Sequence, residues 1–153
     1  MTDVVDKQTR SRMMSGIKGK DTQPEMKVRR YLHGMGFRYR LHSRTLPGAP
    51  DICLARYRVV IFVHGCFWHR HEGCGLSYMP ASNKAQWSGK FKQNVERDRK
   101  NIDALSNAGW RVIILWECGL RRHESTLLDW LPGTIRYENG PQKIEWPIIL
   151  RVK

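Results

Sequence analysis

The chain has 153 residues, which is enough for one domain with a sizeable hydrophobic core and too few for two. Lysine and arginine number 27 against 14 acidic residues, a formal net charge of +13, so the composition favours a polyanionic partner such as nucleic acid. A hydrophobic share of 41% argues against general disorder, and no apolar run approaches the ~20 residues of a membrane-spanning helix. The polar N-terminus is unlike a secretory signal, so we expect a cytoplasmic protein without membrane association.

The first residues, 1–20, are polar and basic and offer little apolar surface for packing. We expect them to form an arm that is flexible without DNA, followed by a single domain over 21–153. A capping-box pattern from Thr22 to Glu25 predicts the start of a helix that ends at Gly36. The residues expected on the buried face of this helix are Val28, Leu32 and Met35.

The remaining elements alternate in a way that predicts an α/β domain, with a mixed central sheet flanked by helices. The strand at 58–65 is apolar on both faces, so helices should cover both sides of the sheet. A helix joins it to the strand at 111–117, so these two strands should be parallel if they are neighbours. Pro147 restricts the last strand to an edge. In chain order we expect strands at 37–42, 51–56, 58–65, 111–117 and 144–152, and further helices at 91–110 and 119–131.

The cysteines suggest a metal site, because a chain without an export signal is expected to keep its thiols reduced. Cys66 and Cys118 each follow one of the two parallel strands, so both should lie at the same edge of the sheet. His71 and Cys74 continue from Cys66 at Cys-x4-His-x2-Cys spacing, and three thiolates with one imidazole suit a structural Zn²⁺. The alternative is that Cys66 and Cys118 are buried small side chains and His71 is a surface residue. Cys53 lies in mid-strand and is expected to be core.

A second group of residues suggests hydrolytic chemistry. Asp51 begins one strand, His64 lies near the end of the next, and His69 follows in the loop. Glu25 and Asp98 lie on the predicted apolar faces of their helices. A Mg²⁺ ion needs only one or two such carboxylates plus a substrate phosphate, and neighbouring histidines can transfer protons. The group therefore suggests phosphodiester hydrolysis.

Each of these residues also has a purely structural explanation. Glu25 can complete its capping box, Asp98 can pair with an arginine, and Asp51 can cap a turn. A histidine considered alone is more often packed than catalytic. On the helix at 91–110, the residues expected to share the buried stripe with Asp98 are Phe91, Val95, Ile102 and Leu105.

Several segments in order resemble the very short patch repair (Vsr) DNA mismatch endonucleases, over roughly residues 5–120. The segments are DKQTRSRMMSGIKGKDTQPE, Pro50-Asp51, VIFVHGCFWHRHEGC and NVERDRKNIDALSNAGWRVIILWEC. The resemblance implies a restriction-endonuclease-like fold and a Mg²⁺-dependent enzyme that nicks one strand. It would cut 5′ to the thymine of a T·G mismatch that arises by deamination of 5-methylcytosine.

The resemblance also implies roles for the catalytic candidates. Asp51 would bind the metal, and Val63 would do so through its backbone carbonyl, at a position where the family pattern has Thr. His64 and Glu25 would position water. His69 would be the general acid or base, and Asp98 would orient it.

The structural zinc ligands of the family match Cys66, His71, Cys74 and Cys118, although the loop before Cys74 is one residue longer than in the shorter family variant. The aromatic residues that wedge into the base stack match Phe67, Trp68 and Trp87, and a minor-groove wedge matches Met14. The alternative for Phe67 and Trp68 is a place in the core.

The implied partner is double-stranded DNA with a T·G mismatch, bound by a monomer in the bacterial cytoplasm and so at the nucleoid. The MutL mismatch-repair protein and a DNA polymerase are further partners that the resemblance implies. Two other functions also agree with the residues: a non-catalytic, zinc-stabilised nucleic-acid-binding protein, and a dimeric restriction endonuclease that cuts both strands of matched DNA.

Overall fold

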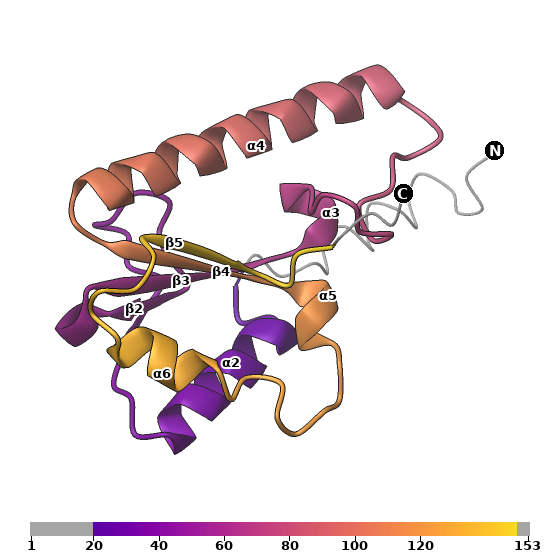
Figure 1. Ribbon diagram of the computed structural model, residues 1–153. Helices are drawn as coiled ribbons and strands as arrows, with labels where there is room; N and C mark the ends of the chain where they lie inside the picture. The colour runs from indigo at the N-terminus through magenta and orange to yellow at the C-terminus, as the bar shows by residue number, and fades with distance from the viewer. Residues whose placement is uncertain (1–19, 150–153) are drawn as a thin grey trace.

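A five-stranded mixed sheet organises the protein (Figure 1), as a computed structural model covering residues 20–149 shows. The strands lie across the sheet in chain order: β1 (Arg40–Leu41), β2 (Ile52–Leu54), β3 (Val59–His64), β4 (Arg111–Trp116) and β5 (Lys143–Trp146). The first three strands are antiparallel, whereas β3 with β4 and β4 with β5 are parallel. The predicted mixed sheet, the parallel pair and the edge position of the last strand are therefore confirmed.

Helices cover both faces of this sheet (Figure 1). The long helix α4 (Lys84–Asn107) lies across one face, and α2 (Gln23–Gly34) and α6 (Leu131–Arg136) lie on the other. Three short helices, η1 (Ala55–Tyr57), α3 (Cys66–His69) and α5 (Glu117–Leu120), follow β2, β3 and β4 directly. The parallel neighbours β3 and β4 thus each lead into a short helix at the same edge of the sheet.

Alternation along β3 decides which residues face α4. Val59 and Ile61 pack into the core on the α2 side, whereas Val60 and Phe62 pack into the core beneath α4. Since successive side chains of a strand point to opposite faces, His64 lies on the α4 side with Val60 and Phe62. The same rule places Asp51 on that side with Cys53 of β2.

Helix α4 differs from the predicted helix at both its start and its buried face. It begins at Lys84 rather than at residue 91, because Trp87 and Phe91 stack one turn apart and extend the packed surface beyond the sheet, against α3. Val95, which was expected to be buried, is 45% exposed. Asn94 takes the buried position, and its side-chain amide is satisfied by donating to the Trp68 carbonyl at 3.2 Å.

The predicted helix at 119–131 is wrong. The chain leaves α5 at Leu120, continues through turns, and starts α6 at Leu131. Pro132 accounts for where the new helix starts, because its ring suits the first turn of a helix.

Two smaller expectations near α2 are also wrong. Met35 lies just beyond the helix and is 44% exposed, since α2 ends at Gly34 rather than at Gly36. The strand expected at 37–42 shrinks to Arg40–Leu41, because Phe37 is drawn into the core, where its ring meets Tyr57 edge-on.

The arm expected at 1–20 lies outside the described residues except for Lys20, and so does Met14. Within residues 20–149, none of the helices combines the length and the apolar character that crossing a membrane requires.

The contact between α5 and the end of β5 is tight enough to predict the effect of one added methyl group. A Cβ on Gly119 would lie 2.6 Å from Pro147 Cδ and 2.7 Å from the Trp146 ring. We therefore expect Gly119→Ala to lower the free energy of unfolding by about 1–3 kcal/mol in urea titrations.

Gly133→Ala in α6 is the matched control, because a Cβ there meets nothing within 4 Å. That change should be neutral or mildly stabilising, as alanine is the better helix former. Equal stability of the two variants would contradict the tight contact.

Candidate active site and metal centre

The four residues predicted as a metal centre come together at the end of the parallel strands. Cys66 and Cys118 lie in the short helices α3 and α5, and His71 and Cys74 lie in the loop after α3. Ligand atoms of the four all lie within 4.8 Å of one another. Convergence of the four side chains is therefore confirmed.

The spacing inside this cluster suits a tetrahedral metal ion. His71 Nδ1 lies 3.6 Å from Cys66 Sγ and 3.4 Å from Cys118 Sγ. Sulfur and nitrogen ligands at usual metal distances are about 3.6 Å apart in a tetrahedral site. Burial raises the pKa of both the Cys66 and the Cys118 thiols, so closely packed thiolates here require a cation.

The orientation of His71 also suits metal binding. Its ring is buried, stacks on Trp116 at 4.3 Å between centroids, and places Nε2 2.8 Å from the Pro147 carbonyl oxygen. Since a carbonyl only accepts, Nε2 carries the proton and Nδ1 presents its lone pair to the thiols. A histidine ligand whose other ring nitrogen donates to a carbonyl is the usual arrangement in protein metal sites.

The catalytic candidates surround a cavity of about 440 Å³ on the α4 side of the sheet. Its lining includes Asp51, Val63, His64, His69 and Asp98. The cavity therefore brings together the strand carboxylate, both histidines and the α4 carboxylate that the sequence suggested.

Asp51 is held between a backbone donor and a second acid. Its Oδ2 accepts a hydrogen bond of 2.7 Å from the Val63 N–H. Burial raises the pKa of Asp51 to about 7, and the carboxylate of Glu25 acts in the same direction, against the Val63 hydrogen bond. Two acids this close together, Glu25 buried and Asp51 half-buried, favour a bound cation, since its charge offsets both desolvation and repulsion.

Glu25 takes part in the N-terminal cap of α2, and its carboxylate also lies close to Asp51. Its N–H donates to the Thr22 hydroxyl oxygen at 3.3 Å, and the residue is only 2% exposed. The guanidinium of Arg29, 3.2 Å from Glu25 Oε2, stabilises the buried carboxylate and so offsets the cost of its desolvation.

The two histidines form a stacked pair. The ring centroids of His64 and His69 lie 3.8 Å apart with the planes 4° from parallel. His69 Nδ1 lies 2.6 Å from Asp98 Oδ2, so Nδ1–H donates to the carboxylate and Nε2 is left for proton transfer. Burial lowers the pKa of His64 well below its usual value, with repulsion from His69 and Lys143 acting in the same direction, so His64 is neutral at pH 7.

An aromatic cluster lies beside this pair, between α3 and the N-terminal half of α4. The ring of Phe67 lies within 5.0–5.5 Å, centroid to centroid, of four others: Trp68, Tyr78, Trp87 and Phe91. Phe91 is buried, Phe67, Trp68 and Trp87 are half-buried, and Tyr78 is 62% exposed. The half-buried rings thus combine partial packing with an accessible edge.

Arg70, which the sequence analysis did not single out, fastens the loop that carries these groups. Its guanidinium donates to the carbonyls of Phe67, Ser77 and Tyr78 at 2.7–3.2 Å. The same group lies 3.9 Å above the Phe91 ring. The sequence gives no signal for this role, because the carbonyl acceptors of Arg70 come together only in the folded loop.

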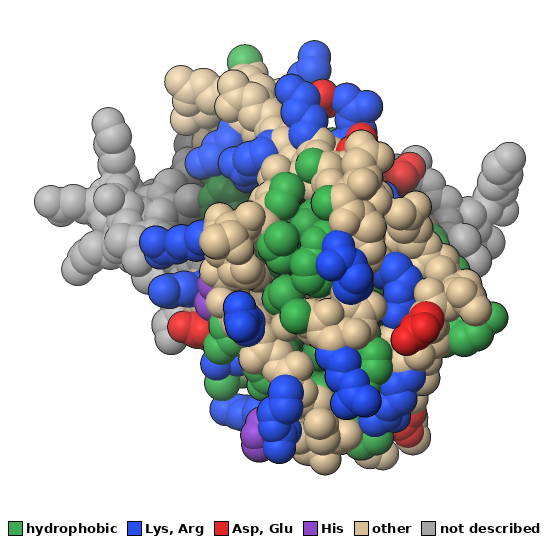
Figure 2. All heavy atoms as spheres, turned by 90° about the vertical axis from the view of Figure 1, so that its left-hand side faces the viewer, with side chains coloured by type: hydrophobic (Ala, Val, Ile, Leu, Met, Phe, Trp, Pro, Cys, Tyr) green, Lys and Arg blue, Asp and Glu red, His purple; other side chains and the backbone are tan. Residues whose placement is uncertain are grey.

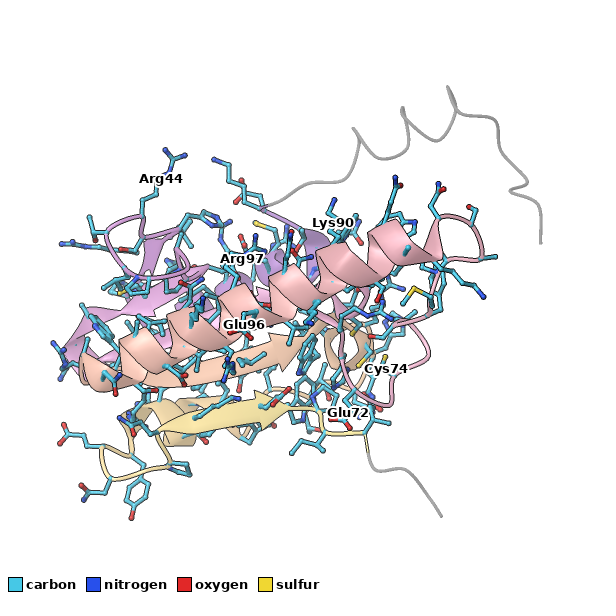
Figure 3. The ribbon with its side chains drawn as sticks, turned by 90° about the horizontal axis from the view of Figure 1, so that it is seen from above. Arg44, Glu72, Cys74, Lys90, Glu96 and Arg97 are labelled. Atoms are coloured by element: carbon cyan, nitrogen blue, oxygen red, sulfur yellow. The ribbon has the colours of Figure 1, made fainter. Side chains whose placement is uncertain are left out.

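Basic side chains flank the site. Arg44 and Arg97 both line the cavity, and Lys90 lies further along α4, 5.2 Å from the Trp68 ring (Figure 3). The face in Figure 2 likewise shows scattered lysines and arginines with few acidic side chains between them. This distribution suits contact with a polyanion.

Comparisons with known proteins agree on one family. A family model described as DNA mismatch endonuclease Vsr matches residues 2–75. The chain is 48% identical to DNA mismatch endonuclease Vsr of Escherichia coli (strain K12), over 81% of this chain and 79% of the relative. It is also 45% identical to the type II nicking enzyme V.XorIIP of Xanthomonas oryzae pv. oryzae, over 78% of this chain and 88% of the relative. A third relative, the type II nicking enzyme V.NmeAIP of Neisseria meningitidis, is 44% identical over 79% and 86% of the two chains.

Proposed function

Because this chain belongs to the Vsr family of DNA mismatch endonucleases, we propose that its cavity is the place where one strand of a mismatched DNA duplex is cut. The observation that carries the proposal is the His69–Asp98 pair, which faces the same cavity as Asp51. A fixed proton carrier opposite a buried carboxylate, with arginines at the rim, is the equipment that phosphodiester hydrolysis needs. The mixed sheet with helices on both faces agrees with a restriction-endonuclease-like fold.

The substrate that we propose is a T·G mismatch, cut 5′ to the thymine, with Mg²⁺ as the catalytic cation. Asp51 and the backbone carbonyl of Val63 would hold this ion, and hard oxygen donors of this kind are what Mg²⁺ prefers. When bound, Mg²⁺ stabilises the negative charge that builds up on the phosphate during cleavage.

The side chains around the cation would divide the remaining work. His69 Nε2 exchanges the proton with the attacking water or the leaving oxygen, while Asp98 keeps the ring in the required tautomer. His64, neutral and stacked on His69, and Glu25 position water, and Arg44 and Arg97 contact backbone phosphates.

We propose that the metal centre of Cys66, His71, Cys74 and Cys118 holds a structural Zn²⁺. The four ligands complete a tetrahedral set and leave no position for substrate, so the ion would fix the loop. Helix α3, which supplies Cys66, also carries Phe67, Trp68 and His69, so the zinc would hold the catalytic and aromatic groups in one fixed arrangement.

Trp68, Trp87 and Phe67 would enter the base stack beside the mismatch, where weak pairing lowers the cost of unstacking. Met14, outside the described residues, would act from the minor groove on the basic arm. We further propose that a monomer carries out the reaction, at the nucleoid of a bacterial cell, and that MutL and a DNA polymerase act in the same repair.

Zinc content is the direct measurement for the metal centre. We expect about one zinc per chain, lost in Cys118→Ala together with a large part of the thermal stability, since the remaining thiolates lose their shared cation. Cys53→Ala is the matched control, because Cys53 lies in the middle of β2 and is not one of the four converging residues, so it should leave zinc content unchanged. A folded, zinc-free wild-type protein would refute the assignment.

Cleavage is measured on duplexes with one T·G mismatch, labelled separately on each strand, in Mg²⁺. We expect a nick on the thymine strand alone, abolished in Asp51→Asn and slowed about 100-fold or more in Asp98→Asn. Asp103→Asn, the same charge change on an exposed position of α4, should cut normally.

Two other results would count against the proposal. Binding without cleavage under any Mg²⁺ condition would favour a nucleic-acid-binding protein without activity. Equal cutting of both strands in matched DNA would favour a restriction endonuclease.

Trp68 is suited to testing whether aromatic rings enter the base stack, because it is half-buried and contacts fewer rings than Phe67. We expect Trp68→Ala to reduce the preference for mismatched over matched DNA about tenfold in binding titrations, as a stacking contact is worth about 1–3 kcal/mol. Tyr137→Ala, which truncates an exposed aromatic at the end of α6, should leave that preference unchanged. A Trp68→Ala variant that loses mainly stability would support a core role instead.

A further inference from the structure

His42 lies opposite Asp51 and lines the catalytic cavity, although no role for it follows from the sequence. The backbone N–H of His42 donates to the backbone carbonyl of Asp51 at 3.1 Å, which continues the pairing of β1 with β2 by one residue. Its φ of 48° lies in the left-handed region, which non-glycine residues seldom adopt. The backbone therefore fixes this imidazole next to Asp51 at the expense of local strain.

The two ring nitrogens of His42 have different surroundings. Nε2 lies 3.3 Å from Glu25 Oε2 and 3.4 Å from Asp21 Oδ1. Both neighbours are carboxylate oxygens, which accept only, so Nε2 carries a proton. The same two carboxylates are held by Arg29, at 3.2 Å from Glu25 Oε2 and 2.7 Å from Asp21 Oδ1. The ring is thus anchored at its outer nitrogen.

The inner nitrogen faces the free oxygen of Asp51. Nδ1 lies 3.8 Å from Asp51 Oδ1, which is too far for a hydrogen bond. Asp51 Oδ2 is already taken by the Val63 N–H. Two ligands about 2.1 Å from one ion lie about 3.0 Å apart at a right angle and about 4.2 Å apart in line. The observed separation of 3.8 Å lies between these two values, so a shift of less than about 1 Å brings both atoms onto one ion.

We infer that His42 Nδ1 is a ligand of the catalytic cation, beside Asp51 Oδ1. The inference rests on the proposed function, in which Asp51 holds that cation. Glu25 and Asp21 then act on the far side of the ring as carboxylates that orient a metal-binding histidine. Imidazole nitrogen is a better ligand for Mn²⁺ than for Mg²⁺, so the site should prefer Mn²⁺ over Mg²⁺ more strongly than an all-oxygen site would.

The test uses Mn²⁺ and pulsed electron paramagnetic resonance on the zinc-loaded, full-length protein without DNA. Wild type should show coupling between the bound Mn²⁺ and ¹⁴N of an imidazole. His42→Gln should lose this coupling and bind Mn²⁺ about tenfold more weakly. His33→Gln, an exposed histidine at the end of α2, should behave as wild type.

A second variant separates ligation from a purely structural role. His42→Gly suits the left-handed backbone, so the fold should survive, and ¹⁵N-labelled imidazole added to it should restore tight binding with a ¹⁵N coupling. Persistent ¹⁴N coupling in His42→Gln, no ¹⁵N coupling in the rescued variant, or no Mn²⁺ bound by wild type would each overturn the inference.

The outcome is distinguishable from failure of the proposed function. Strand-specific nicking by wild type together with any of those negative results would leave the nuclease and refute only the His42 ligand. A ¹⁵N coupling in a protein that cuts no mismatched DNA with any divalent cation would support the ligand and refute the nuclease.

Discussion

The parallel pairing of β3 with β4 is the constraint on which the rest of the site depends. Six residue pairs run in step from Val59 and Arg111 to His64 and Trp116, so both strands end at the same level. The segments that follow the two strands, α3 and α5, therefore lie next to each other. For this reason Cys66 and Cys118 converge, although 51 residues and a long helix separate them along the chain. The same pairing places Trp116 beside His64 and His71, against whose rings it packs edge-on and face-on.

At that edge, several separate contacts hold α3 and the loop that follows it. The thiol and imidazole cluster holds its interior, Arg70 gathers three carbonyls, and the Ser77 hydroxyl donates to the Cys66 carbonyl at 2.5 Å. These contacts hold His69 against Asp98, which belongs to α4. They also hold the half-buried rings of Phe67 and Trp68 at the surface beside α4.

Much of this arrangement could be predicted from the sequence, because it follows from rules that act along or between strands. Alternation in β3 places His64, and strand ends place Cys66 and Cys118. The helix start at Lys84 could not be predicted, since stacking of Trp87 on Phe91 depends on tertiary context, whereas Pro132 was a local signal for the start of α6. His42 was missed for a similar reason: a two-residue strand and a left-handed φ give no periodic signal, and its partners are distant in the chain.

The hydrogen bond from His71 to Pro147 links the loop to a segment made 76 residues later. Synthesis runs from the N-terminus, so β3, α4 and β4 can all be in place before this carbonyl exists. The imidazole therefore receives its orienting partner only near the end of translation. A chain that stopped before β5 would retain every residue that lines the cavity and still lack one of the contacts that hold the loop beside it. Completion of the polypeptide and the final orientation of His71 are in this way linked by one peptide carbonyl.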